Sequence, residues 1–239
     1  MLENRQAVEQ IYQAFLAKLE EPRIASLIRR VKDSTSTKDL HTKGSAVILY
    51  TPWRYQPDLM MIGTNPSWFH KGMGEPKLHA RTQALQNLNQ VRQKVPTVNS
   101  YIEHDHEFSM KLRSYFEPFG AINLLRECVG MNRFWIQTGS SSSIKLTDFQ
   151  DKLILKELKD FCTEKTRAIV ALTQPKTLWL LGKPAQECFE GWDHTLHGIE
   201  YVINSWHPCQ TLQKNQQIAD ARNKEITREL SSRYAAVEK

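Results

Sequence analysis

The chain has 239 residues, 40% of them hydrophobic and 24% charged, a composition typical of a globular protein with one large domain or one domain with an extension. No apolar run approaches the roughly 20 residues of a membrane-spanning helix, and the start of the chain lacks the apolar segment of a signal peptide, so we expect a cytoplasmic protein with no membrane partner. The net charge of +6 favours polyanionic partners, although many basic proteins bind no nucleic acid.

The N-terminal part is predicted to be a helical extension. Apolar residues recur at helical spacing over residues 4–20, and a second helix is expected after Pro22. The polar stretch 33–45 is predicted to be a loop, and a short edge strand is expected over residues 47–50. We therefore divide the chain into an extension, 1–45, and one compact α/β domain, 46–239.

Four short apolar runs in that domain are predicted to be buried parallel strands, because each is apolar on both faces and ends at Gly, Asn or Ser. They are Leu59–Ile62, Phe134–Ile136, Thr177–Leu181 and Tyr201–Ile203. Helical segments separate them, among them one over 146–162 whose apolar face includes Leu153 and Leu158. This alternation predicts a three-layer α/β/α sandwich around a central four-stranded parallel sheet.

Two proline-containing corners follow the first and last predicted strands, Gly63-Thr64-Asn65-Pro66 and Ser205-Trp206-His207-Pro208. A residue before proline is held extended and proline favours the first position of a helix, so each corner predicts a strand end, a turn and a helix start. Parallel strands bind ligands at their carboxyl ends, where we expect Asn65 and His207. Asparagine is also a common helix cap, whereas histidine is a less usual one.

No metal or cofactor is predicted. The four cysteines form no CxxC pair, so we expect reduced thiols and not a zinc ribbon or an iron–sulfur cluster. His104-Asp105-His106 is a possible ligand cluster, but adjacent helical residues do not share a face, and we interpret the segment as a helix start.

These corners resemble the two motifs of the uracil-DNA glycosylase superfamily. The first motif has the form G-x-[D/N]-P, here Gly63 to Pro66, and the second is built on His-Pro, here His207-Pro208-Cys209-Gln210. The segment TLWLLGKPAQ at 177–186 is similar to the strand-Gly-x-x-Ala-Gln segment before the family's last strand. The resemblance spans about residues 58–215 and is closer to the branches with asparagine in the first motif.

The resemblance implies hydrolysis of the bond between a base and its sugar in DNA. Asn65, with the main chain of Thr64 and Pro66, would position the attacking water, and His207 would donate a hydrogen bond to the departing base. Asn132, with Asn123 as the second choice, would recognise the edge of the base. A ring after the first motif, Phe69 or Trp68, would stack on the base, which must be flipped out or single-stranded.

Further residues are implied as contacts to the substrate or to DNA, and each has an ordinary structural alternative as a turn, loop or helix residue. They are Gly63, Ser67, Ser140, Ser141, Pro208, Cys209, Gln210 and Leu212, the last at the position of the family's apolar wedge. The chain departs from the family pattern at Ser67, which replaces glycine or tyrosine, and at Cys209-Gln210, which replaces Ser-Pro.

The leading hypothesis is a monomeric DNA glycosylase that excises uracil or a related damaged or mismatched base without metal or cofactor. The substitutions Asn65 and Cys209 favour an alternative, a non-catalytic module that binds nucleic acid or nucleotides and retains the fold. A third hypothesis is an α/β enzyme that acts on another small anionic substrate with His207 as the acid.

Overall fold

The computed structural model describes residues 2–26, 48–64, 95–103, 105, 107–135, 152–208 and 216–234. The chain divides into two compact units. The first unit combines Met1–Leu49, Thr64–Pro96 and Asn132–Leu172, and the second combines Tyr50–Gly63, Thr97–Met131 and Thr173–Lys239.

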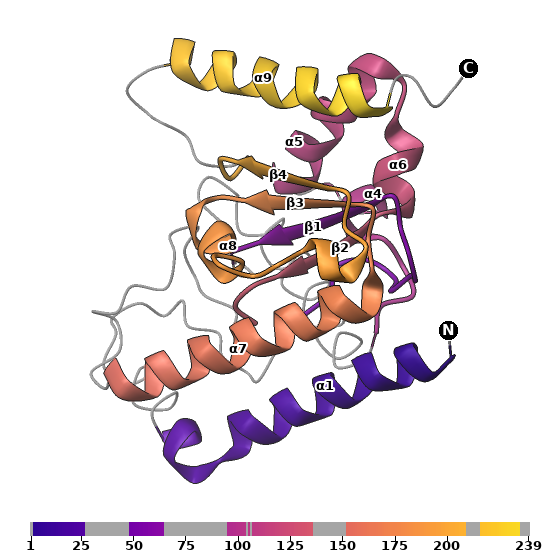
Figure 1. Ribbon diagram of the computed structural model, residues 1–239. Helices are drawn as coiled ribbons and strands as arrows, with labels where there is room; N and C mark the ends of the chain where they lie inside the picture. The colour runs from indigo at the N-terminus through magenta and orange to yellow at the C-terminus, as the bar shows by residue number, and fades with distance from the viewer. Residues whose placement is uncertain are drawn as a thin grey trace, which may run out of the picture. The chain divides into compact units, whose positions relative to one another are not determined.

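A four-stranded sheet forms the centre of the fold (Figure 1). Its strands are β1 (Leu59–Gly63), β2 (Val129–Asn132), β3 (Thr177–Leu181) and β4 (Tyr201–Ser205), in the order β2-β1-β3-β4. β3 pairs in parallel with β1 on one side and with β4 on the other. The predicted α/β class and central four-stranded parallel sheet are therefore confirmed.

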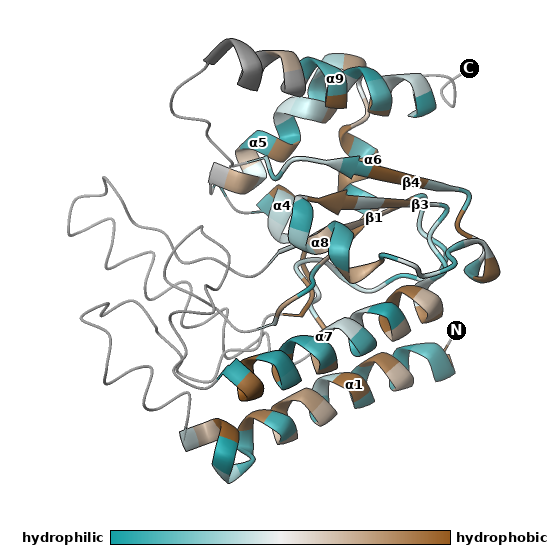
Figure 2. Ribbon diagram, turned by 60° about the vertical axis from the view of Figure 1, so that its left-hand side comes forward, coloured by the Kyte–Doolittle hydropathy of each residue, from teal (hydrophilic) through white to brown (hydrophobic). Residues whose placement is uncertain are grey.

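Both faces of the sheet are covered, since every residue of β1 and β3 is buried. On one face, Leu59, Met61 and Trp179 join a core with residues from α4 (Ser100–Glu103), α5 (Glu107–Phe116), α6 (Ile122–Glu127) and α9 (Gln216–Tyr234). The intervening residues of β1 and β3 point to the other face, where they are equally buried. α8 (Lys183–Cys188) follows β3 directly and packs against it. In Figure 2 the strands β1 and β3 are largely brown, as expected for strands that are buried on both faces.

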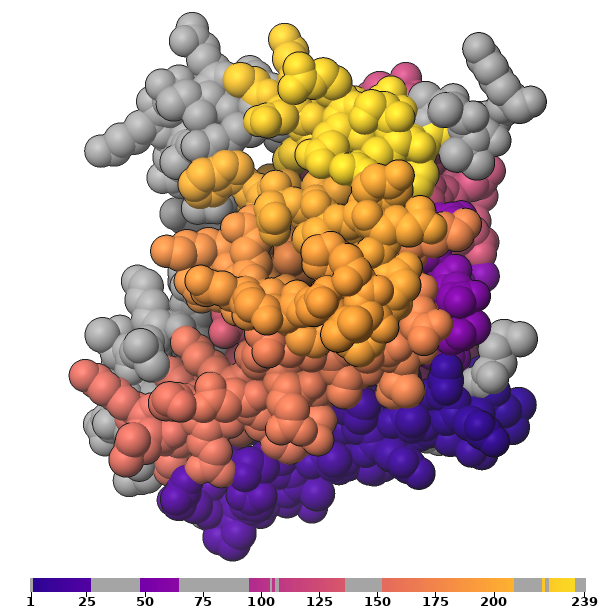
Figure 3. All heavy atoms as spheres, in the orientation of Figure 1, coloured from indigo at the N-terminus to yellow at the C-terminus, as the bar shows by residue number. Residues whose placement is uncertain are grey.

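The first unit is built on two long helices, α1 (Leu2–Glu20) and α7 (Lys152–Thr173), which lie side by side (Figures 1 and 3). Phe15 of α1 contacts Trp135 edge-on with ring centroids 5.0 Å apart, and it stacks on Phe161 of α7 at 6.1 Å. Glu157 of α7 accepts hydrogen bonds from Lys18 and Arg23. The predicted N-terminal helix is confirmed, and helical backbone continues over residues 22–26.

The structure corrects the position of one predicted strand. The second strand is Val129–Asn132 and not Phe134–Ile136, because Phe134 and Trp135 lie in irregular backbone after it, and Ile136 lies outside the described residues. The predicted edge strand over 47–50 is limited to a single bridge at Leu49 within the described residues. On α7 the buried face carries Ile154, Leu155 and Leu158, whereas Leu153 is 77% exposed, so its assignment to the apolar face was wrong.

Strand β2, whose position was predicted wrongly, contains Gly130. A glycine is needed there because the ring of Tyr101 lies against it. A Cβ atom at residue 130 would lie 2.3 Å from Cε2 of Tyr101, and the ring is 2% exposed and stacked on Tyr50. We expect Gly130→Ala to lower the free energy of unfolding by roughly 1–3 kcal/mol, the usual cost of overpacking. Urea unfolding measures this effect, and the penalty should vanish in a Tyr101→Ala background. An unchanged unfolding midpoint would contradict the contact.

The three cysteines in the described part of the chain, Cys128, Cys162 and Cys188, are buried and form no disulfide. Burial raises the pKa of the Cys128 thiol far above its usual range, so this group stays protonated and unreactive. Among the described helices, none is long and apolar enough to cross a membrane.

Candidate functional site

His207 follows the carboxyl end of β4, and Ser205 fixes the backbone that leads to it. The Ser205 hydroxyl accepts a hydrogen bond from Nε1 of Trp179 at 2.7 Å and donates to the carbonyl of Trp206 at 3.1 Å. The Ser205 carbonyl accepts from the backbone N–H of Gly182 at 2.8 Å and from Nε2 of Gln186 at 2.9 Å. The Gly-x-x-Ala-Gln segment thus ties β3 and α8 to the strand end that carries His207.

Gly182 allows His207 to lie against the end of β3. Its φ of 89° and ψ of 159° fall in a region of backbone conformation open almost only to glycine. A Cβ atom at this position would lie 3.3 Å from Cβ of His207, closer than most real contacts. Glycine at residue 182 is therefore needed both for the turn and for the place of the imidazole.

Phe108 of α5 covers one face of the His207 imidazole. The two rings are stacked with centroids 5.2 Å apart and an interplanar angle of 23°, and Phe108 in turn contacts Tyr101 edge-on at 5.7 Å. Burial lowers the pKa of His207 to about 4, although part of the side chain remains exposed. His207 is consequently neutral at physiological pH, and a neutral imidazole both donates and accepts a hydrogen bond.

The lowered pKa predicts a pH dependence of stability. In the unfolded chain a histidine titrates near pH 6.5, so between about pH 4 and 6.5 the unfolded state binds more protons than the folded one, and stability falls as the pH decreases through this window. Allowing for the partial exposure, we expect the wild type to lose about 1–2 kcal/mol more than His207→Gln between pH 7.5 and 4.5. Urea unfolding at both pH values measures the difference. Equal losses in the two proteins would contradict the lowered pKa.

Asn132 is the last residue of β2 and carries a buried amide with an unused donor. Its side chain is only 5% exposed, and within the described part of the chain Nδ2 has no hydrogen-bond partner. The backbone around it is fixed, because its N–H donates to the carbonyl of Ile48 at 3.2 Å and its carbonyl accepts from Nε1 of Trp135 at 2.7 Å. A buried donor without a partner costs about 1–3 kcal/mol, which marks this amide as a candidate ligand-binding group.

The ends of three strands lie in one row at the carboxyl edge of the sheet. Ile62 pairs with Leu180, and Leu181 pairs with Ser205, so Gly63 at the end of β1 lies level with Ser205 at the end of β4. One strand lies between them, which corresponds to a separation of about 10 Å. In the first unit, the carbonyl of Thr64 accepts a hydrogen bond from the N–H of Phe134 at 2.9 Å, which joins the start of the first corner to the segment after β2.

Several predicted site residues lie outside the described residues, so their placement stays a prediction. They are Asn65, Pro66, Ser67, Trp68, Phe69, Ser140, Ser141, Cys209, Gln210 and Leu212. Of the others, Gly63 is buried at the end of β1, Thr64 is half-buried after it, and Pro208 is partly exposed beside His207.

Asn123, the second choice for recognising the base, does not lie at the carboxyl edge. It is exposed on α6, which leads into the amino end of β2, and its side-chain oxygen accepts a hydrogen bond from Arg126 at 2.7 Å. Asn132, by contrast, lies at the carboxyl end of β2, and its role in recognising a base stays a prediction. Phe108 was missed by the sequence reasoning, because nothing in a segment almost 100 residues earlier in the chain indicates a ring contact with His207.

Among the described residues, no three His, Cys, Asp or Glu side chains gather as a metal-binding group. No family model matches the chain, and no curated protein matches it. Among solved structures, the chain is similar to the crystal structure of wild-type SMUG2 from Pedobacter heparinus, with a TM-score of 0.42 and 15% sequence identity. That similarity covers 78% of this chain and 76% of the other.

Proposed function

We propose that this chain is a DNA glycosylase that hydrolyses the N-glycosidic bond of uracil or a related damaged or mismatched base. The attacking water forms a bond to C1′ of the sugar as the bond from C1′ to the base breaks, and it releases one proton to solvent. The bonding electrons leave with the base, which becomes an anion and then takes a proton from solvent. The products are a free base and an abasic site in an otherwise intact strand.

The main support for the proposal is that His207 is a neutral, partly buried histidine at the end of a strand. It follows the carboxyl end of a parallel strand, where ligands of such sheets bind, and burial beneath Phe108 keeps it uncharged. An N–H donor held rigidly in a partly desolvated position stabilises negative charge as it develops on a base oxygen. The hydrogen bonds of Ser205 supply the rigidity, since they fix the backbone two residues before the imidazole.

Asn132 supports the proposal because it offers a group that could recognise the base. Its buried Nδ2 donor suits a carbonyl oxygen on the edge of a pyrimidine or a related base. In this mechanism Asn65 orients the attacking water through hydrogen bonds, because an amide cannot remove a proton at neutral pH. Leaving-group stabilisation by His207 must then supply most of the rate enhancement.

The partner proposed for the chain is DNA, bound by a monomer with the target base extruded or already unpaired. The net charge of +6 favours association with a polyanion.

The proposal is tested with labelled oligonucleotides that contain uracil, hypoxanthine or a mismatch, in single- and double-stranded form. After incubation with the protein, alkali cuts any abasic site, and a gel resolves the product. We expect alkali-dependent cleavage of at least one substrate. Salt-sensitive binding without cleavage of any of them would instead favour a non-catalytic nucleic-acid-binding protein.

Gly182→Ala is expected to lower both stability and excision. The strained backbone costs roughly 1–3 kcal/mol, and the added Cβ displaces His207 by a few tenths of an ångström. Gly191→Ala is the matched control, because Gly191 also has a positive φ, 67°, but no atom within 4 Å of the added Cβ. Urea unfolding and single-turnover excision measure the two effects. Similar excision rates in both variants would contradict the role of Gly182 in placing His207.

A further inference from the structure

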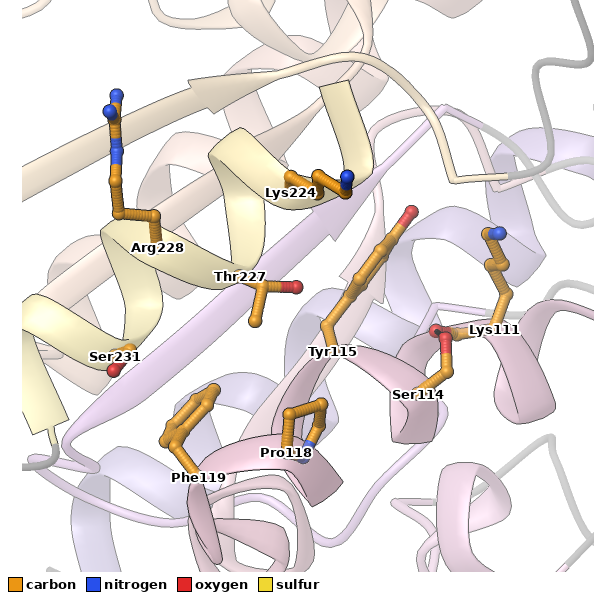
Figure 4. A pocket seen from close by; sticks show the side chains of 9 residues that line it. All are labelled: Lys111, Ser114, Tyr115, Pro118, Phe119, Lys224, Thr227, Arg228 and Ser231. Carbon is orange, nitrogen blue, oxygen red and sulfur yellow. Dashed lines mark hydrogen bonds between the residues drawn. The ribbon is translucent and has the colours of Figure 1, made fainter. Parts of the chain in front are cut away.

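An open groove with a volume of about 500 Å³ lies between α5 and α9 in the second unit. Neither His207 nor Phe108 lines it. One wall is formed by α5 and the turn after it, with Lys111, Tyr115 and Phe119, and the other by α9, with Lys224 and Thr227 (Figure 4). The ammonium groups of Lys111 and Lys224 approach the Tyr115 hydroxyl from opposite sides, whereas the Arg228 side chain extends away from the centre of the groove.

In the described part of the chain, no carboxylate neutralises the positive charges of the groove. Within the described residues, Lys111, Lys224 and Arg228 form no ion pair, and no carboxylate lines the groove. Basic residues close to them in the chain are paired, since Arg113 contacts Asp105 and Arg233 contacts Glu229. Unpaired cations on two facing helices create a local positive potential that attracts an anionic ligand.

The floor of the groove is aromatic and fits a ligand that alternates charged and apolar groups. Phe119 is partly exposed at one end, and Lys111 lies over the Tyr115 ring with its Nζ 6.0 Å from the ring centroid. Thr227 adds a hydroxyl that faces the same space. A nucleic-acid strand carries such alternation, because phosphates bind cations while sugars and bases pack on rings.

Helix α5 connects the groove to the residues around His207. Lys111 follows Phe108 by three residues on α5, so the two side chains lie about one helical turn apart on the same side of the helix. Phe108 stacks on His207. A strand with one base at His207 therefore has neighbouring phosphates within reach of the Lys111 end of the groove.

We propose that the groove between α5 and α9 binds the sugar–phosphate backbone of the DNA strand beside the target base. This inference rests on the proposed function, since it extends the same DNA interface. Lys111 and Lys224 bind phosphates, and Phe119 supports a sugar or base. The groove adds affinity and does not take part in the chemical step.

Binding of a fluorescent single-stranded oligonucleotide at several salt concentrations tests the groove. We expect Lys111→Gln/Lys224→Gln to weaken binding on the order of tenfold and to reduce the slope of log affinity against log salt by about 1.5. The control Arg54→Gln/Lys176→Gln removes the same charge from exposed, carboxylate-paired positions near the amino ends of the strands, and should retain the slope. Lys111→Arg/Lys224→Arg, which keeps the charge, should also retain it.

Equal losses in the groove variant and the control, or no loss in either, would overturn the proposal. A groove variant that lost affinity for vesicles of anionic lipid but not for DNA would overturn it in favour of a membrane surface. At saturating DNA, the groove variant should excise the base within about threefold of the wild-type rate, whereas His207→Ala should bind with an unchanged slope and excise about 10²–10³-fold more slowly. If the wild type binds through the groove but excises no base, the proposed function fails while the groove remains a DNA-binding site.

Discussion

His207→Ala is expected to lower the single-turnover rate of base excision by about 10²–10³-fold, the usual effect of removing one donor that stabilises an oxyanion. The reason is chemical: the base leaves as an anion, and the neutral imidazole under Phe108 supplies a fixed N–H donor to it. His207→Gln keeps an N–H donor on a side chain of similar reach, so it should recover part of the rate. Rapid-quench kinetics at saturating enzyme separate this effect from DNA binding.

The lower excision rate of His207→Ala must come from a slower chemical step and not from unfolding of the variant. His207 is partly exposed, and its replacement leaves the Ser205 hydrogen bonds intact, so at pH 7.5 we expect the fold to be retained, with an unfolding midpoint lowered by the loss of the ring contact with Phe108. A His207→Ala variant that excised the base at the wild-type rate would remove the main support for the mechanism. A variant that merely unfolded would be recognised by its midpoint, and His207→Gln would then provide the test.

Asn132→Leu is expected to separate function from stability. Leucine removes a buried donor that has no partner among the described residues, so the free energy of unfolding should stay the same or rise by up to about 1–2 kcal/mol. The same change removes the group proposed to bind the base edge, and kcat/KM for excision should fall by at least about 10²-fold. Urea unfolding and steady-state kinetics on one preparation measure both effects.

Asn99 offers a matched control, because it is a second buried asparagine whose amide is fully used. It is 7% exposed, its Nδ2 donates to the carbonyls of Leu125 and Arg126, and its Oδ1 accepts from the N–H of Tyr101. We expect Asn99→Leu to lower the free energy of unfolding by roughly 1–3 kcal/mol. If Asn132→Leu were equally destabilising, Asn132 would be a structural residue and its proposed role would be wrong.

The strands that local pattern predicts well are those whose apolar run is unbroken. Leu59–Gly63 and Thr177–Leu181 are buried on both faces, and each is a short apolar run bounded by turn residues, so the local pattern indicates them. The second strand was misplaced because Gly130 interrupts its apolar run and resembles a turn residue. Its reason for being glycine is the ring of Tyr101, a contact that no local pattern reveals.

The candidate site was predictable only in part, because contacts between residues far apart in the chain leave no local pattern in the sequence. His207 could be found because a histidine before proline at a strand end is unusual, and Asn132 because an asparagine was expected near the second strand. The stacking of Phe108 on His207, and therefore the lowered pKa, depends on the packing of α5 next to the end of β4. The unused donor of Asn132 likewise becomes visible only when its neighbours are in place.

Release of a free base from DNA shows directly whether this chain acts as a glycosylase. An oligonucleotide with the substrate base is incubated with the wild-type protein in H₂¹⁸O, and mass spectrometry follows both the free base and the abasic strand. We expect one equivalent of free base and ¹⁸O at C1′ of the abasic sugar, with both products forming about 10²–10³-fold more slowly in His207→Ala. DNA binding by the wild type with no free base from any substrate in the set would contradict the proposed glycosylase activity.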